Sequence, residues 1–77
     1  MKIYIAHNEF GHACPTAISP SGNEVIFDLD KISGELKKRL YGQMGLVELS
    51  VDDMNEIKKA RRGVRKVSQS VISNIYK

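Results

Sequence analysis

The sequence predicts a small α+β protein, in which an antiparallel sheet of three to four strands is covered on one face by two helices. Short runs of β-branched and aromatic residues fill the first part of the chain, with turn-forming residues between them. Two later segments repeat apolar residues at steps of three and four, as helices do. The predicted order is β-β-β-α-β-α in a single domain, residues 1–77, that ends in a long helix.

Three strands are expected before the first helix, at 2–6, 16–18 and 24–29. In the first of them, Ile3 and Ile5 share one face and Tyr4 lies on the other, because side chains alternate along a strand. The segment 19–23 is dense in Ser, Pro, Gly and Asn, each of which favours a turn. The second and third strands are therefore predicted to form a hairpin.

The first helix is predicted to begin at Asp28 or Asp30, whose carboxylates can accept unpaired backbone N–H groups, and to end near Tyr41. Its apolar face consists of Leu29, Ile32, Leu36 and Leu40. Gly42 is expected to stop it, because glycine adopts the left-handed conformation without penalty. A short strand at 46–49 is expected to follow.

The second helix is predicted to run from Ser50, as its N-cap, to about Tyr76. Acidic residues in its first turns favour a helix start. Apolar residues at steps of three and four then give it one narrow apolar face, formed by Ile57, Ala60, Val64, Val67, Val71 and Ile75. Such a face suits packing on the sheet or on a second copy of the chain.

The small size of the chain points to a homodimer. A domain of this length buries only about 60% of its unfolded surface, and a disulfide, a metal or self-association usually supplements its core. The single cysteine, Cys14, excludes an internal disulfide. The sequence has neither an apolar run of about 18 residues nor a signal peptide's apolar stretch. We therefore expect a cytoplasmic protein without a membrane segment.

The positive charge is concentrated in the C-terminal third. The net charge is +3, and residues 50–77 alone contribute +4. At the centre lies a segment with six cations and no acidic residue, namely Lys58, Lys59, Arg61, Arg62, Arg65 and Lys66. On the predicted helix these cations form a continuous basic stripe beside the narrow apolar face. A smaller cluster, Lys37, Lys38 and Arg39, either widens this surface or complements the dipole at the end of the first helix.

The basic stripe predicts a protein that acts by binding. Closely spaced cations neutralise the phosphates of a nucleic acid, and the Ser, Gln and Asn side chains that follow suit contacts to a 2′-hydroxyl. RNA is therefore favoured over DNA. An acidic protein surface is the alternative partner. The third interpretation is that the cations only keep the helix surface solvated and bind no partner. The size and charge fit a phage-type regulator or a counter-defence inhibitor.

Neither catalysis nor a bound metal is expected. His7, His12 and Cys14 are residues of the types that ligate metals, and they lie in one loop. A structural zinc site, however, needs four ligands, usually in two close pairs. A nucleophilic pair of Cys14 and His12 lacks a third group to orient the histidine. The sequence therefore predicts no enzyme activity and no cofactor.

Overall fold

The computed structural model describes residues 1–7 and 14–76. In this part of the chain, five strands form one antiparallel sheet in the order β4-β1-β2-β3-β5. The strands are β1 (Lys2–His7), β2 (Pro15–Ile18), β3 (Asn23–Phe27), β4 (Gly45–Glu48) and β5 (Arg61–Lys66). The helices are α1 (Gly34–Leu40), α2 (Val51–Lys59), α3 (Gln69–Ile75) and the short 3₁₀ helix η1 (Leu29–Lys31). The α+β class is confirmed, with one more strand and one more α-helix than predicted.

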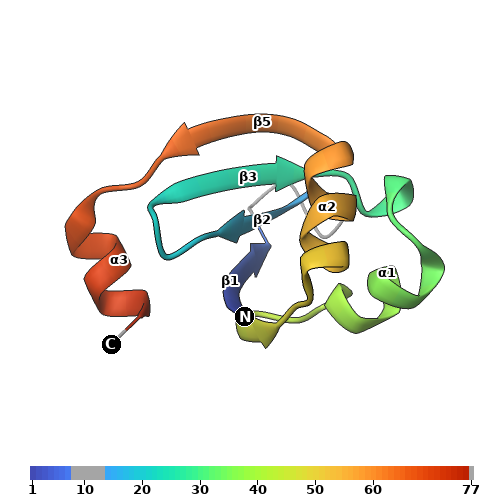
Figure 1. Ribbon diagram of the computed structural model, residues 1–77, viewed down its shortest axis with the longest axis horizontal. Coiled ribbons are helices and arrows are strands. Elements are labelled where there is room, and N and C mark those ends of the chain that lie inside the picture. Colours follow the sequence, from blue (N-terminus) through green and yellow to red (C-terminus); the bar gives the residue numbers. More distant parts are fainter. Residues whose placement is uncertain (8–13, 77) are drawn as a thin grey trace.

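The long C-terminal helix predicted from Ser50 to about Tyr76 is wrong. The chain leaves the helical conformation at Ala60, continues as β5, and becomes helical again in α3 (Figure 1). Gly63 and Val64 both favour this outcome, since glycine weakens a helix by about 1 kcal/mol relative to alanine and valine suits a strand. The decisive contribution is long-range, because β5 pairs with the edge of β3 that would otherwise be exposed.

The first predicted helix is divided in two. Asp28 caps η1 by accepting from the Asp30 N–H, whereas Ser33 caps α1 by accepting from the Leu36 N–H. Gly42 follows the end of α1 with φ of +74°, which confirms its role as a stop. The N-cap of the next helix is also confirmed, because Ser50 and Asp53 form a reciprocal capping box.

The core lies between one face of the sheet and the helices α1 and α2. The pairs Ile3–Val47, Ile5–Ala17 and Ala17–Val25 place one apolar row on this face. In Figure 1, α2 crosses one end of the sheet, with α1 beyond it. The buried cluster consists of Ile3, Ile5, Ala17, Phe27, Leu29, Leu36, Leu40, Leu49, Ile57 and Ala60. The predicted narrow apolar face is therefore divided: its first two residues are buried here, whereas Val64 and Val71 are exposed.

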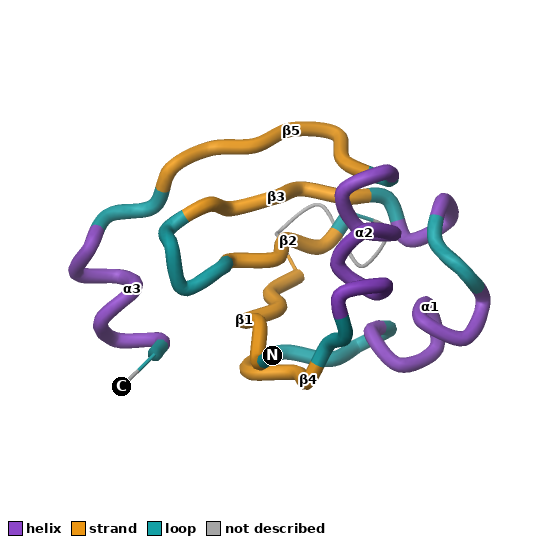
Figure 2. Tube along the Cα trace, viewed as in Figure 1, coloured by secondary structure: helices purple, strands orange, loops and turns teal. Residues whose placement is uncertain are grey.

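The helix α3 lies at the other end of the sheet, beside the turn between β2 and β3 (Figure 2). The Val67 N–H donates to the Gly22 carbonyl at 2.8 Å, and Ile72 is buried against this turn. The Tyr76 hydroxyl accepts from the Tyr4 N–H and donates to the Ile18 carbonyl. α2 and α3 thus occupy opposite ends of the sheet and leave part of its apolar face between them.

Candidate nucleic-acid interface

The predicted basic stripe is not a helical face. Lys58 and Lys59 form the last turn of α2, and the other four cations, Arg61, Arg62, Arg65 and Lys66, lie on β5. All six side chains are exposed. β5 is an edge strand that pairs only with β3 among the described strands. We call this region, residues 58–66, the basic edge.

The strand conformation distributes the charges differently from a helix. The partners in the β3–β5 register include Asn23–Lys66, Glu24–Arg65 and Val25–Val64. Because side chains alternate along a strand, Lys66 and Val64 lie on the face that carries α2, whereas Arg65 lies on the opposite face. Arg62 is the extra residue of a β-bulge, since its two neighbours pair with the consecutive residues Phe27 and Ile26.

Two cations of the basic edge are compensated within the fold. Arg65 forms an ion pair with Glu24, which is otherwise buried on the sheet face. Arg62 Nη1 lies 3.6 Å from an Asp28 carboxylate oxygen and donates to Cys14 Sγ at 3.9 Å. The remaining four cations form no ion pair among the described residues: Lys58, Lys59, Arg61 and Lys66. These four carry the charge that is available to a partner.

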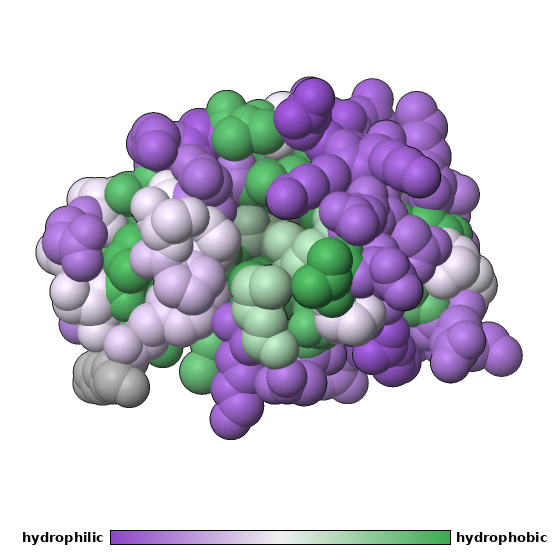
Figure 3. All heavy atoms as spheres, in the orientation of Figure 1, coloured by the Kyte–Doolittle hydropathy of each residue, from purple (hydrophilic) through white to green (hydrophobic). Residues whose placement is uncertain are grey.

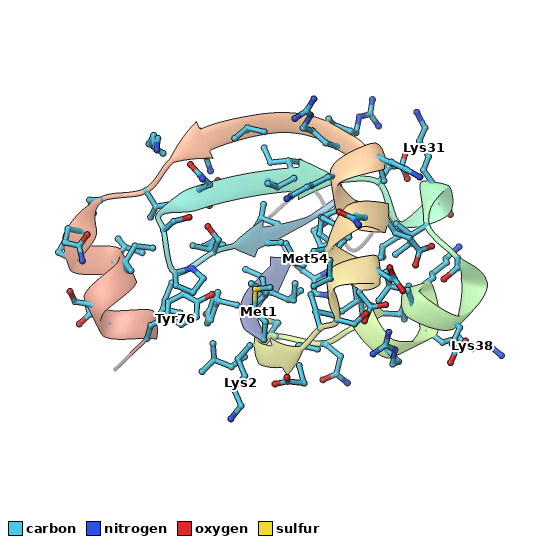
Figure 4. The ribbon with its side chains drawn as sticks, in the orientation of Figure 1. Met1, Lys2, Lys31, Lys38, Met54 and Tyr76 are labelled. Carbon is cyan, nitrogen blue, oxygen red and sulfur yellow. The ribbon has the colours of Figure 1, made fainter. Side chains whose placement is uncertain are left out.

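The smaller cluster on α1 is not brought to the basic edge. Lys37 donates to Asp30 at 2.8 Å, and a hydrogen bond from Lys37 lowers the pKa of that carboxyl. Arg39 donates at 2.8 Å to Asp53, in the acidic first turn of α2. Lys38 points away from the molecule at the end opposite α3 (Figure 4). This cluster therefore serves mainly to join α1 to its neighbours.

Sequence reasoning missed one cation near the basic edge. The Asp28 N–H donates to the Ala60 carbonyl, and the Lys31 N–H donates to the Asp28 carbonyl, both at 3.1 Å. Lys31 is therefore one turn from the junction of α2 and β5, and Figure 4 shows it beside that junction. The predicted helix from Asp28 or Asp30 implies no contact with residue 60, so the sequence alone does not place Lys31 there.

Of the two histidines and the cysteine considered as ligands or nucleophiles, the structure describes His7 and Cys14. His7 Nε2 lies 3.3 Å from the Leu40 carbonyl oxygen, and Cys14 contacts Arg62. His12 lies outside the described residues. Within residues 1–7 and 14–76, no three His, Cys, Asp or Glu side chains are grouped so that they could hold a metal ion.

No protein-family model, curated protein or solved structure matches this chain. None of the helices in the described part is long and apolar enough to cross a membrane, and α2, the longest, has nine residues.

Proposed function

We propose that the protein binds nucleic acid through the backbone phosphates, with RNA favoured over DNA. The observation that supports this proposal is the group of four exposed cations on the basic edge that have no ion pair among the described residues. No acidic residue lies between positions 57 and 67. A strand of six residues is about 17–20 Å long, so the cations can contact several phosphates along one backbone.

Single-stranded RNA suits this surface better than duplex DNA. The basic end of α2 is its C-terminus, and its N-terminus carries Asp52 and Asp53, which repel phosphate. α2 is therefore a poor candidate for insertion into a major groove. Ser68, Gln69 and Ser70 are exposed directly after β5 and offer hydrogen-bonding groups to a ribose. Binding would be driven by charge and would select weakly among sequences.

An acidic protein surface is the alternative partner, and the edge position of β5 favours it. The outer side of β5 pairs with no described strand, so an extended acidic segment could add to the sheet there. The cations would then pair with its carboxylates. Either partner is compatible with a small phage-type regulator or counter-defence inhibitor.

The proposed homodimer would use the other edge of the sheet. Two copies of β5 would bring cations face to face, which is unfavourable. β4 forms the opposite edge, and exposed apolar side chains lie on or beside it, namely Tyr41, Met44 and Leu46. Association through β4 would cover them and leave both basic edges accessible.

The nucleic-acid proposal is tested by titrating labelled single-stranded RNA and duplex DNA with the protein at several salt concentrations. Four phosphate contacts on a single strand predict a slope of log K against log salt of roughly −2.8. The variant K59Q/K66Q should weaken binding and reduce the slope by about 1.4. These two lysines are chosen because neither forms an ion pair among the described residues. Their substitution therefore leaves no carboxylate without its partner there.

The matched control is K2Q/K38Q, which removes the same two charges from exposed sites outside the basic edge. It should retain most of the affinity and the original slope. Equal losses in the two variants would show that only net charge matters and would contradict a defined interface. If neither RNA nor DNA binds while a poly-glutamate peptide does, the protein-partner alternative replaces the proposal.

A further inference from the structure

A groove of about 430 Å³ lies on the apolar face of the sheet, between α2 and the turn that joins β2 to β3. Its floor is formed by Ile3, Ala17, Val25 and Val64, one from each of four adjacent strands. Figure 3 shows this hollow as an apolar area in the middle of the face, with hydrophilic side chains around it. The volume lies within the range of about 300–1,000 Å³ that is usual for small-molecule sites.

The walls of the groove are apolar and adaptable. Met1, Val51 and Met54 line it, and methionine side chains adjust readily to the shape of a ligand. Val64 on the floor is 52% exposed and Val51 is 67% exposed. The groove therefore leaves aliphatic surface in contact with water, and covering this surface would be favourable.

The polar rim carries a single sign of charge. Lys58 and Arg61 lie on it, together with the neutral side chains of Ser19, Ser21, Asn23 and Asn55. In the described part of the chain, no acidic residue lines the groove. The Met1 ammonium is already paired with Glu48 at 2.5 Å. The rim therefore presents two cations, without an ion pair among the described residues, beside an aliphatic floor.

We propose that this groove binds a small amphiphilic anion, namely a soluble aliphatic carboxylate. The carboxylate would pair with Lys58 and Arg61, and the aliphatic chain would lie over Val64, Val25 and Ala17. A nucleobase is a poorer ligand, because none of the described residues that line the groove is aromatic and bases bind largely by stacking. A purely hydrophilic anion would leave the floor uncovered. Only a molecule with both parts satisfies the rim and the floor together.

The test is an NMR titration of the full ¹⁵N-labelled chain with octanoate and, separately, with 1-octanol. Octanoate should shift the amides of Ala17, Val25 and Val64, and should bind at least tenfold more tightly than the alcohol. The variant K58Q/R61Q should abolish this preference and leave the binding of 1-octanol unchanged. The variant K59Q/K66Q should bind octanoate as the unmodified chain does, which separates this site from the proposed nucleic-acid interface.

A second pair of variants tests the location. V64W fills the floor of the groove, whereas V71W makes the same substitution at an exposed valine (39%) of α3 that does not line the groove. V64W should lose octanoate binding and V71W should retain it, with circular dichroism reporting whether each remains folded. The proposal is overturned if 1-octanol binds as tightly as octanoate or if shifts appear around Leu46. It is also overturned if dilution alone shifts the groove amides, since a second copy would then occupy the groove.

Discussion

The substitution Y76F tests how α3 is joined to the sheet. The Tyr76 hydroxyl accepts from the Tyr4 N–H at 2.9 Å and donates to the Ile18 carbonyl. Tyr4 and Ile18 are opposite each other in the β1–β2 register, so the hydroxyl bridges the two strands. Phenylalanine keeps the aromatic ring but removes both hydrogen bonds. It also leaves a backbone donor and a backbone acceptor without this partner.

The expected loss in the free energy of unfolding is about 2 kcal/mol. Each hydrogen bond contributes roughly 0.5–1.5 kcal/mol net, and a fully buried group left without a partner costs about 1–3 kcal/mol. Both bonds are only partly buried, so water recovers some of the loss. For a domain of this size, 2 kcal/mol lowers the melting temperature by roughly 8–16 °C. Urea unfolding should show a lower midpoint with an unchanged slope.

The effect of Y76F on the free energy of unfolding should become smaller at alkaline pH. Burial raises the pKa of Tyr76, although the hydrogen bond from the Tyr4 N–H opposes that rise. Because the folded state holds the phenol proton more tightly, this contribution is complete below about pH 10 and is lost as the pH rises through the folded pKa. The difference between the unmodified chain and Y76F should therefore shrink above pH 10.

The control is Y4F, which removes a hydroxyl that makes no hydrogen bond within the described residues. Y4F should leave the urea midpoint within about 0.5 kcal/mol of the unmodified chain. Hydrogen exchange shows whether Y76F releases α3 alone, since the amides of residues 69–75 would then lose protection before the sheet does. The reasoning is refuted if Y76F changes neither the midpoint nor the exchange of α3.

Two further substitutions test the start of α2 and the β4 edge. Burial alone would raise the pKa of Asp53, but hydrogen bonds from Arg39 and from the Ser50 N–H outweigh it and lower the pKa. D53N should therefore reduce stability by about 1 kcal/mol at pH 7 in urea unfolding, and the difference should shrink as the pH falls below about 4 and through the folded pKa. L46K should convert the proposed dimer to a monomer in sedimentation equilibrium, and a monomeric mass for the unmodified chain would contradict the dimer.

The parts of the fold that the sequence predicted well are those with strong local signals. Ser50 and Asp53 form a capping box within four residues of chain, and the box does not depend on the rest of the molecule. The turn at 19–23 contains residues that bend the backbone for separate reasons, and β2 and β3 pair across it. Gly42 likewise needs only its own conformation to end α1.

The C-terminal segment could not be predicted in the same way, because two structures fit its apolar spacing. Ile57 and Ala60 lie on the inner face of α2, whereas Val64 is placed by its pairing with Val25. That pairing joins residues 39 positions apart, so no local pattern encodes it. Gly63 and Val64 argue locally against a continuous helix, but the cost of Gly63, about 1 kcal/mol, does not exclude one.

The ion pairs of the candidate site could not be predicted from the sequence for the same reason. The sequence identified all six cations of the basic edge, but not which of them are compensated. Arg65 pairs with Glu24, 41 positions earlier, and Arg62 pairs with Asp28, 34 positions earlier. Both contacts exist only because β5 lies beside β3. The number of cations available to a partner is therefore a property of the sheet and cannot be obtained by counting charges.

The early end of α2 explains why a charged edge and an apolar groove occur together. Because the chain turns at Ala60 and continues as β5, none of the described helices covers the row formed by Val25 and Val64. The same turn places Lys58 and Arg61 at the rim of the uncovered area. A continuous helix would have formed a basic stripe without a groove beside it. The two proposed binding surfaces thus arise from one change of backbone conformation, and they separate experimentally because Lys59 and Lys66 do not line the groove.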